Sequence, residues 1–341
     1  MSEGNWSSKA SSEVIIERAL MSKNIRAFFD ARDVIEVETP LLSQFATTDP
    51  HLDSFQSCFR EQPCFLNTSP EYAMKRLLST LHKPIYQIGK AFRDDELGAN
   101  HNPEFTMLEW YQPAYDDEQL MDEMEALIQT IAEQSSNKRL LASESSCGAN
   151  SGLRFKRLSY QQAFELVTGI NPHTTTAAEC YQVAIDNKVS IPQGLTLAEE
   201  ELNDWLDWLL TQLILPSFNN EGFVFIYDYP ASQCALAKIA LNQQQIPVAK
   251  RFELFFDEVE LANGFYELTD AETQLARFEA DNLRRVAIGK APVRIDENFI
   301  AALNHGLPEC SGVALGLDRL LMVVCGFSDI RQVLSFSWHE S

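Results

Sequence analysis

The start of the chain alternates apolar and polar positions in two different ways. Within residues 12–30 the apolar side chains recur at steps of seven, four and three, which places them on one face of a helix. The residues on this face are Val14, Met21, Ile25 and Phe28. Residues 33–40 then alternate β-branched and acidic side chains and end in a proline, which predicts a short strand after the helix.

Two later segments have the pattern of strands joined by a charged loop. Residues 85–89 and 104–111 are strand-like, and residues 93–102 between them are polar, which predicts a long hairpin. Further on, the small residues at 310–316 lead directly into an Asp-Arg pair. This last pattern predicts a strand that enters a helix.

The middle of the chain is mainly helical by pattern. Residues 117–134 have helical periodicity, whereas residues 134–152 are rich in Ser, Asn, Gly and Lys and predict a flexible surface insertion. Residues from about 158 to 215 contain three further helical patterns, which predict an inserted helical region. Residues 223–267 return to strand-like runs, and residues 271–286 again have the pattern of a helix.

The charge balance disfavours one class of partner. The 341 residues include 27 basic and 49 acidic side chains, for a formal net charge of −22. Holding nucleic acid along its phosphates requires clustered Lys and Arg, so extensive RNA binding is disfavoured. The length is compatible with two domains of typical size or with one large catalytic domain.

Cysteine usage and the N-terminus indicate the compartment. The seven cysteines are scattered and lack a CxxC pair, which favours a reduced compartment over a disulfide framework or a zinc site. Residues 1–12 are polar and lack the apolar core of a signal peptide, and no run of about 18 apolar residues occurs. We therefore expect a cytoplasmic protein that does not contact a membrane.

Three separated segments together resemble the signature motifs of class II aminoacyl-tRNA synthetases. These are the strand that ends in Pro40, the hairpin that opens at Phe92-Arg93 and closes on Phe105, and the strand that ends in Asp318-Arg319. Residues 68–71, 105–111 and 260–268 are in addition similar to the lysyl-tRNA synthetase branch. The resemblance covers the chain from about residue 13 to residue 338.

A departure from lysyl-tRNA synthetases narrows the resemblance. Those enzymes carry an anticodon-binding domain before this core, whereas only about a dozen polar residues precede the first predicted helix here. With Tyr-X-Met-Lys-Arg-Leu at residues 72–77 and Asn-Pro-Glu-Phe at 102–105, the chain resembles the elongation factor P–(R)-β-lysine ligases. This resemblance implies an α+β fold with a mixed, mostly antiparallel sheet flanked by helices. It also implies one catalytic domain at residues 13–338, after a disordered terminus at residues 1–12 and without an anticodon-binding domain.

The activity of this family requires residues that bring a carboxylate and ATP together. Adenylation needs two anions held close and charge stabilised on the phosphoryl oxygens, a task that suits the guanidinium fork. The resemblance implies that Arg93 contacts the α-phosphate and Arg319 the γ-phosphate, although an arbitrary Asp-Arg pair is most often a surface ion pair. The further ATP contacts that it implies are Phe105 stacked on adenine, His101 and Asn102 closing over the nucleotide, and Asp94, Asp95, Glu260, Leu261 and Gly316.

One position of the hairpin departs from the family pattern. The glutamate that usually stands two residues after the arginine is replaced by Asp95, which is one methylene shorter. Either Asp95 acts through a water molecule or Glu96 takes its place, and both alternatives stay open.

The resemblance assigns the metal ion and the amino-acid substrate to carboxylates. Glu253 and Glu260 are its ligands for Mg²⁺, which accepts hard oxygen atoms while it bridges phosphates. Without that context, glutamates in an acidic chain most often form a solvated face. The implied substrate contacts are Glu267 to the substrate ammonium, Glu71 and Glu109 to amino groups, the Tyr111 hydroxyl, and Ser69, Pro70 and Asn263.

Ala314 is the position that indicates which substrate is used. Lysyl-tRNA synthetases have glycine here, and in the ligase family this alanine accompanies a β-amino rather than an α-amino substrate. One methylene-sized change in a pocket is worth about 1–3 kcal/mol of discrimination. The alternative is a neutral packing substitution.

The function implied by the resemblance is an ATP-dependent ligase. It activates (R)-β-lysine as an adenylate and transfers it to a lysine of elongation factor P, and the class uses the Pro40 segment to form a C₂ homodimer. Two alternatives stay open: a truncated lysyl-tRNA synthetase, and a non-catalytic amino-acid sensor. The acidic charge and the missing anticodon domain count against the first, and the retained motif arginines and glutamates count against the second.

Overall fold

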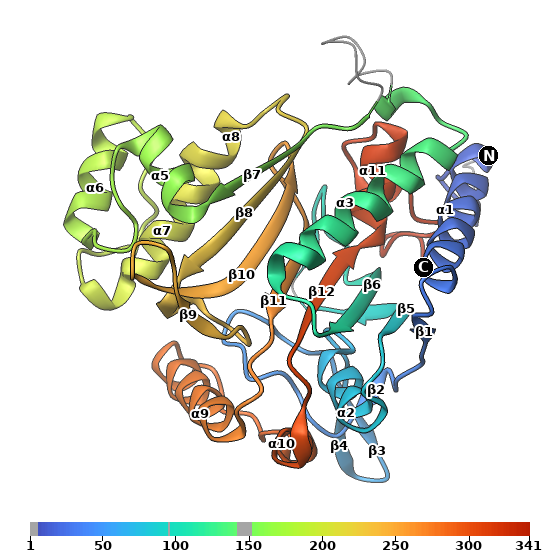
Figure 1. Ribbon diagram of the computed structural model, residues 1–341, viewed down its shortest axis with the longest axis horizontal. Coiled ribbons are helices and arrows are strands. Elements are labelled where there is room, and N and C mark those ends of the chain that lie inside the picture. The colour runs from blue at the N-terminus through green and yellow to red at the C-terminus, as the bar shows by residue number, and fades with distance from the viewer. Residues whose placement is uncertain (1–5, 95, 142–151) are drawn as a thin grey trace. The chain divides into compact units, whose positions relative to one another are not determined.

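The computed structural model describes residues 6–94, 96–141 and 152–341. The chain folds into two compact units (Figure 1). Unit 1 combines Met1–Asn150 with Leu268–Ser341, and unit 2 is Ser151–Glu267. The single catalytic domain predicted for residues 13–338 therefore contains two units, each of which is described by itself below.

Unit 1 begins with the predicted helix. Helix α1 spans Ser12–Asp30, the Ser11 side chain accepts a hydrogen bond from the Val14 amide at its start, and the predicted apolar face is buried. The following strand is shorter than the predicted 33–40. Asp33 adopts a left-handed backbone (φ 56°) and the Val34 amide bonds back to the Phe29 carbonyl, so only Ile35–Glu36 remains extended as β1.

The predicted hairpin forms the centre of the sheet in unit 1. Strands β5 (Ile85–Phe92) and β6 (Glu104–Pro113) pair antiparallel, β12 (Cys310–Gly316) pairs antiparallel with the other side of β6, and β1 pairs parallel with β5. Helices α3 (Asp117–Gln134) and α11 (Leu317–Cys325) pack against these strands (Figure 1). The hairpin and the strand that enters a helix are both confirmed.

Unit 1 also contains elements that the sequence pattern did not predict. A small antiparallel sheet has the order β2 (Leu42–Ser43), β4 (Gln62–Leu66), β3 (Gln56–Phe59). Helices α2 (Glu71–Leu81) and α10 (Glu297–Gly306) and the short η4 (Ile330–Gln332) were also not predicted. Helix α9 (Ala271–Ala287) forms where a helix was predicted at residues 271–286. Helices α2 and α10 pack together, with the Tyr72 ring stacked on Phe299 at 4.7 Å between centroids. Helix α2 was not predicted because its buried face contains the polar Lys75 and Ser79 beside Met74 and Leu78.

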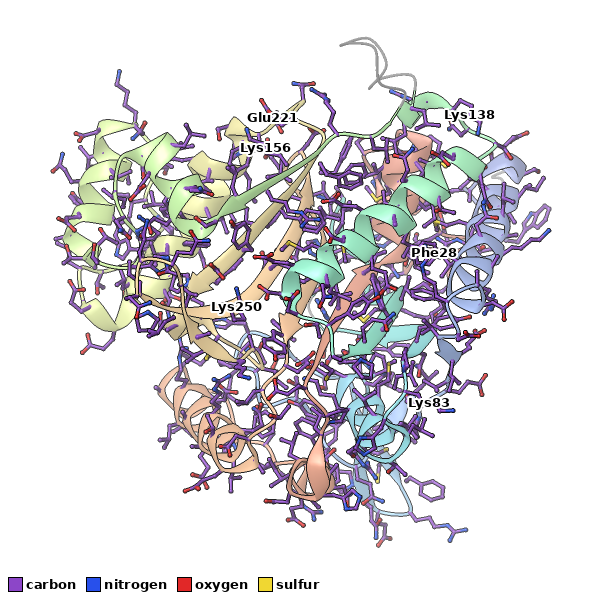
Figure 2. The ribbon with its side chains drawn as sticks, viewed as in Figure 1. Phe28, Lys83, Lys138, Lys156, Glu221 and Lys250 are labelled. Atoms are coloured by element: carbon purple, nitrogen blue, oxygen red, sulfur yellow. The ribbon has the colours of Figure 1, made fainter. Side chains whose placement is uncertain are left out.

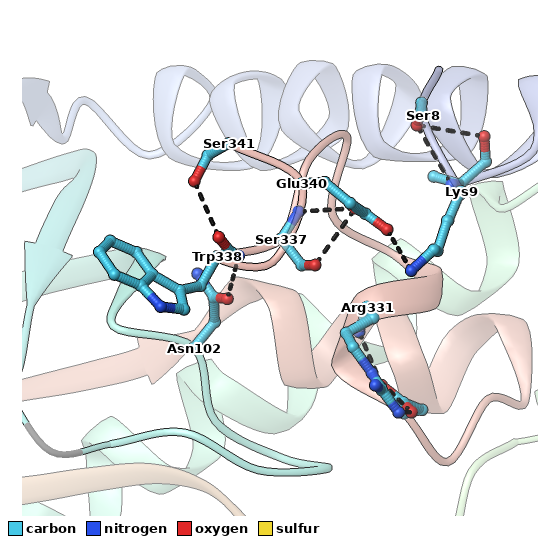
Figure 3. Close-up of polar contacts among 10 residues, drawn as sticks. Ser8, Lys9, Asn102, Arg331, Ser337, Trp338, Glu340 and Ser341 are labelled. Carbon is cyan, nitrogen blue, oxygen red and sulfur yellow. Dashed lines mark hydrogen bonds and ion pairs between the residues drawn. The ribbon is translucent and has the colours of Figure 1, made fainter. Parts of the chain in front are cut away.

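Lys9, near the start of the described residues, contacts the C-terminal segment in unit 1. The Lys9 ammonium lies 2.6 Å from the Glu340 carboxylate, and the same carboxylate accepts hydrogen bonds from the amide and hydroxyl of Ser337 (Figure 3). Ala10 is buried. Disorder was predicted for residues 1–12, but these contacts order residues 9 and 10, while residues 1–5 lie outside the described residues.

The predicted insertion at 134–152 is only partly described. Ser135 and Leu140 are buried, and the Ser136 amide donates to the Glu17 carboxylate of α1 at 3.1 Å. The first part of the segment therefore packs on unit 1 instead of forming a loose surface loop. Residues 142–151 lie outside the described residues.

Unit 2 places helices against its own sheet. Strand β10 (Pro247–Phe256) pairs antiparallel with β8 (Phe223–Pro230), with β11 (Val259–Tyr266) and with the short β9 (Ile239–Leu241). Strand β7 (Phe155–Ser159) pairs parallel with β8. The helical elements are α5 (Tyr160–Thr168), α6 (Ala177–Asp186), η1 (Glu199–Glu201), α7 (Leu202–Leu209), the π-helical η2 (Leu210–Ile214), α8 (Leu215–Ser217) and η3 (Ala231–Gln233). The helices predicted between 158 and 215 are thus present.

The core of unit 2 is apolar and its edge is polar. Tyr160, Trp205 and Phe255 are buried in one cluster between the helices and the strands. At the surface, the Lys156 ammonium of β7 pairs with Glu221 at 3.3 Å (Figure 2). In both units most strand pairs are antiparallel and helices cover them, which confirms the α+β class. Within the described ranges, no helix combines the length and apolar character needed to cross a bilayer.

Candidate active site

Glu109 occupies the centre of the sheet in unit 1. It lies on β6 between Gln87 of β5 and Ala314 of β12, which are its direct partners in the register. Its carboxylate is buried and accepts hydrogen bonds from the Tyr111 hydroxyl at 2.6 Å and the Ser69 hydroxyl at 2.7 Å. The structure therefore brings together residues that are 40 and more positions apart in the chain.

The start of α2 adds charged groups to this cluster. Pro70 provides the first carbonyl of the helix, which accepts from the Met74 amide, and the Ser69 hydroxyl accepts from the Glu71 amide at 3.0 Å. One turn later, the Lys75 ammonium pairs with the Glu71 carboxylate at 2.6 Å. The Lys75 side chain is 1% exposed and that of Glu71 is 18% exposed, so the ammonium end of this ion pair is buried.

The environment of Glu109 disfavours its charged form. Burial is the largest cause and the nearby Glu71 carboxylate the next, and together they raise the pKa of Glu109 to about 7. The hydrogen bonds from Tyr111 and Ser69 and the charge of Lys75 act in the opposite direction. A substrate ammonium would add a further positive charge and favour the carboxylate, so the cluster is suited to binding an amine.

Ala314 contributes its methyl group to the same face of the sheet. Every second residue of β12, at positions 312, 314 and 316, points to this face, and two of the three are glycines, Gly312 and Gly316. Directly opposed residues of antiparallel strands have Cβ atoms about 4.5–5.5 Å apart, which places this methyl beside Glu109. Over these five positions, Ala314 is the only residue whose side chain reaches that face.

Arg93 stands where the hairpin loop begins. Its amide donates to the Pro103 carbonyl at 3.0 Å, and its guanidinium lies 3.4 Å from Glu96 and 5.1 Å from the ring centre of Phe105. Phe105 shares a face of β6 with Glu109, because residues four apart on a strand point the same way. The Nε of Arg93 is buried with no hydrogen-bond partner among the described residues, which leaves one donor for an anion.

Three acidic residues, Asp94, Asp95 and Glu96, follow Arg93 in the hairpin loop. Asp94 is exposed, and its amide donates to the Asp53 carbonyl at 2.9 Å. Asp95 lies outside the described residues. The Glu96 carboxylate lies 3.4 Å from the Arg93 guanidinium and 4.0 Å from the His101 ring. It therefore contacts two of the residues predicted to bind ATP.

Arg319 lies in the first turn of α11, which begins directly after β12 ends at Gly316. Its side chain contacts the end of the hairpin loop opposite to Arg93. Its guanidinium donates to the Asn100 carbonyl at 3.1 Å and lies 2.8 Å from Nε2 of His101. Burial, and then the charge of Arg319, lower the pKa of His101, so the ring is neutral and accepts this hydrogen bond. The Asn102 side chain donates to the Glu104 carbonyl and accepts from the Trp338 amide at 3.0 Å (Figure 3).

Asp318 is a buried residue that the sequence analysis left without a role. One carboxylate oxygen accepts from the Thr106 amide at 2.6 Å, next to Phe105, and the other pairs with Arg18 of α1 at 2.5 Å. Arg18 also donates to the Val333 carbonyl. The network ties α1, β6 and α11 together, and only the fold reveals it because its members are about 200 to 300 positions apart.

Unit 2 carries the candidate metal ligands. Glu253 of β10 is buried, its carboxylate is paired with Arg251, and it accepts from the Tyr229 hydroxyl at 2.7 Å. Burial, followed by the charge of Glu253, raises the pKa of Tyr229 well above its usual value. The hydroxyl therefore stays protonated and donates the hydrogen bond to Glu253. Glu253 is therefore a mostly buried side chain held by Arg251 and Tyr229.

Glu260 shares a face of the β10–β11 pair with Glu253. The register places Glu260 opposite Phe255 and Glu253 opposite Asn263, with Leu261 at the irregularity between them. Leu261 and Glu267 are buried, and the Asn263 side-chain oxygen is buried with no hydrogen-bond partner among the described residues. Within the ranges that the structure describes, no group of three or more His, Cys, Asp or Glu side chains forms a metal site.

Comparisons with known proteins identify the family. The model for class II tRNA synthetases (D, K and N) matches residues 5–340, so the chain belongs to this family. Elongation factor P–(R)-β-lysine ligases from Hamiltonella defensa and Proteus mirabilis are 43% and 44% identical, each over 98% of both chains. The ligase of the same name from Vibrio cholerae is 43% identical, also over 98% of both chains. Within the class II family, the chain thus belongs with the elongation factor P–(R)-β-lysine ligases.

Proposed function

We propose that this protein activates (R)-β-lysine with ATP and transfers it to elongation factor P. In the first step a carboxylate oxygen of the amino acid attacks the α-phosphorus of ATP, the adenylate forms, and pyrophosphate leaves. In the second step the ε-amine of a lysine on elongation factor P attacks the carbonyl carbon, loses a proton, and releases AMP. The result is an amide bond, so the enzyme is an ATP-dependent carbon–nitrogen ligase.

The cluster around Glu109 is the observation that carries this proposal. A buried carboxyl with a pKa of about 7, held by Tyr111 and Ser69, is a ready acceptor for a substrate ammonium. The methyl of Ala314 lies opposite it in the register and takes volume where an α-amino substrate would otherwise have room. The relatives that carry the ligase name match the chain over nearly its whole length.

For ATP, we assign Arg93 to the α-phosphate and Arg319 to the γ-phosphate. Both arginines are half-buried at the hairpin loop, and Arg93 keeps a buried donor for an anion. A guanidinium that is already in place stabilises charge as it develops, at no cost of reorganisation. Phe105, on the same face as Glu109, is assigned to the adenine, and His101 and Asn102 to the closure of the loop.

For Mg²⁺, we assign Glu253 and Glu260 as ligands. Two hard carboxylates on one face of the β10–β11 pair have the donor chemistry that this ion accepts. When bound, the ion would neutralise phosphate charge. In unit 2 we assign Glu267 and Asn263 to the polar groups of the amino acid.

We also propose that the protein is a homodimer. Leu41 and Leu42, directly after Pro40, are 40% and 47% exposed, and Ile16 of α1 is 63% exposed. Exposed apolar side chains on these two segments are compatible with an isologous interface. Light scattering coupled to size-exclusion chromatography distinguishes a dimer from a monomer, and Leu42→Asp is expected to shift the mass toward the monomer.

Intact-mass spectrometry of the acceptor tests the function. Elongation factor P is incubated with the enzyme, ATP and either (R)-β-lysine or α-lysine, in the cytoplasmic pH range. A mass gain of one lysyl group, larger with (R)-β-lysine, is expected. An unmodified factor together with charged tRNA in a parallel assay would instead support the truncated synthetase.

Two controls make the result specific. The acceptor lysine of the factor is replaced by arginine, which removes the attacking amine and should abolish the mass gain. The Arg319→Ala enzyme should lose activity with both isomers while it keeps the wild-type circular dichroism spectrum. Absence of amino-acid-dependent pyrophosphate exchange in the wild type would favour the non-catalytic sensor.

A further inference from the structure

Lys75 is a buried cation inside the cluster around Glu109. Its side chain is 1% exposed, and its ammonium lies 2.6 Å from the Glu71 carboxylate. It also lies 5.9 Å from the ring centre of Tyr111 on β6 and 5.9 Å from that of Phe299 on α10. A lysine is almost never buried this deeply unless it is paired, so its position calls for an explanation beyond helix stability.

The ion pair with Glu71 does not by itself explain why position 75 carries a charged side chain instead of an apolar one. Replacing a buried ion pair by apolar residues of similar volume is often neutral or stabilising. On an amphipathic helix such as α2, a methionine and a glutamine would fill the same space. The neighbours of Lys75 provide a different reason, because Glu71 and Glu109 are two carboxylates that affect each other.

We infer that Lys75 is a positioning residue of the amine site: it cancels the charge of Glu71, so that Glu109 alone accepts a substrate ammonium. This inference rests on the proposed function and deepens it. With Lys75 in place, the three ionisable side chains carry at most one net negative charge, which matches one ammonium group. Lys75 also holds one oxygen of Glu71 in place, and the Ser69 hydroxyl holds the backbone of Glu71.

The groups that face Glu109 within unit 1 make the inference testable through pH. They are Glu71 and Lys75 on α2, Ser69 before it, Tyr111 on the same strand, the neutral Gln87 on β5 and Ala314 on β12. Binding of an ammonium requires the Glu109 carboxylate. The fall of kcat/KM on the acid side of the pH profile, the acid limb, should therefore follow the pKa of Glu109.

Removing either charge of the ion pair should move this limb in opposite directions. Lys75→Met removes a cation that favours the Glu109 carboxylate, so the acid limb of kcat/KM for (R)-β-lysine should move to higher pH. Glu71→Gln removes an anion that disfavours the carboxylate, so the limb should move to lower pH. Glu71 affects the pKa of Glu109 more strongly than Lys75 does, so the shift in Glu71→Gln should be the larger of the two.

Pyrophosphate exchange from pH 5.5 to 9 with (R)-β-lysine is the primary measurement. The effect should appear mainly in KM for the amino acid, and KM for ATP should stay within about twofold, because Lys75 acts on the amine site. Lys75→Arg, which keeps the charge, should keep the limb near its wild-type position. The double change Glu71→Gln with Lys75→Met removes both partners of the ion pair and leaves no buried charge without its partner, so it remains foldable if a single variant does not.

The outcomes separate a role in the charge balance of the amine site from a purely structural one. If Lys75 only stabilises the fold, Lys75→Met lowers the melting temperature while the pH limb stays in place, and the inference is overturned. A limb that moves the same way in Lys75→Met and Glu71→Gln would overturn it as well. If the wild type itself shows no exchange dependent on (R)-β-lysine, the proposed function fails, and that result is seen before any variant is compared.

Discussion

Ala314→Gly tests how the sheet of unit 1 selects its substrate. Ala314 is directly opposite Glu109 in the β12–β6 register, and its neighbours on that face are Gly312 and Gly316. The substitution therefore removes the single carbon that β12 presents there between residues 312 and 316. The loss opens space beside the amine site without touching a charge or a hydrogen bond.

The expected magnitude follows from one methyl group. Discrimination by one methylene in a pocket is worth about 1–3 kcal/mol, or about 10- to 200-fold in kcat/KM. The ratio of kcat/KM for (R)-β-lysine over α-lysine should fall by a factor in this range, mainly because α-lysine improves. The backbone cost of glycine in a strand is roughly 0.5–1 kcal/mol, so the protein should remain folded.

Adenylate formation with each isomer, measured by pyrophosphate exchange, checks this prediction. Val313→Ala is the matched control, since Val313 is a buried neighbour on β12 whose side chain points to the opposite face. It should lower stability and leave the isomer ratio unchanged. The reasoning is refuted if Ala314→Gly leaves the ratio at its wild-type value, or if Val313→Ala changes it equally.

Three further substitutions probe other parts of the molecule. Arg319→Ala should reduce adenylation by roughly 10²-fold or more, the scale of one lost transition-state donor, and a rate near wild type would exclude a role in binding ATP phosphate. Glu260→Gln should abolish Mg²⁺-dependent exchange with the fold intact, whereas the exposed neighbour change Glu258→Gln should not; equal activity of both variants would contradict the metal assignment. Gly264→Ala should destabilise unit 2 by about 1–3 kcal/mol, because the added Cβ would lie 2.4 Å from the Phe252 ring; an unchanged denaturation midpoint would show that the ring moves aside.

Local patterns predicted the elements whose periodicity and end signals agree. Helix α1 spans the predicted residues 12–30 with Ser11 as its cap, and α3 spans the predicted 117–134 with a capping box at Asp116 and Gln119. The strand predicted at 33–40 was too long, because Asp33 turns the backbone at the end of α1. Helix α2 was missed because a buried lysine breaks its apolar pattern.

For the candidate site, the sequence proposed a set of residues but not their arrangement. The motifs around Arg93, Glu253 and Arg319 are visible in the sequence, and the family match over residues 5–340 confirms the class that they indicated. Nothing local indicated that Asp318 binds Arg18 and the Thr106 amide. Such pairs join segments hundreds of positions apart, and their geometry depends on strand register.

By itself, the sequence determined the long hairpin through short-range periodicity, and it indicated the fold class and the chemistry of the family through motifs that resemble those of class II synthetases. The tertiary structure alone decided the environment of Glu109. Strand register places Ala314 opposite it, and the start of α2 brings Ser69 to its carboxylate, with Glu71 and the buried Lys75 on the first turns of the same helix. Burial and neighbouring charge set the pKa of a carboxyl group, and both exist only after distant segments have packed together.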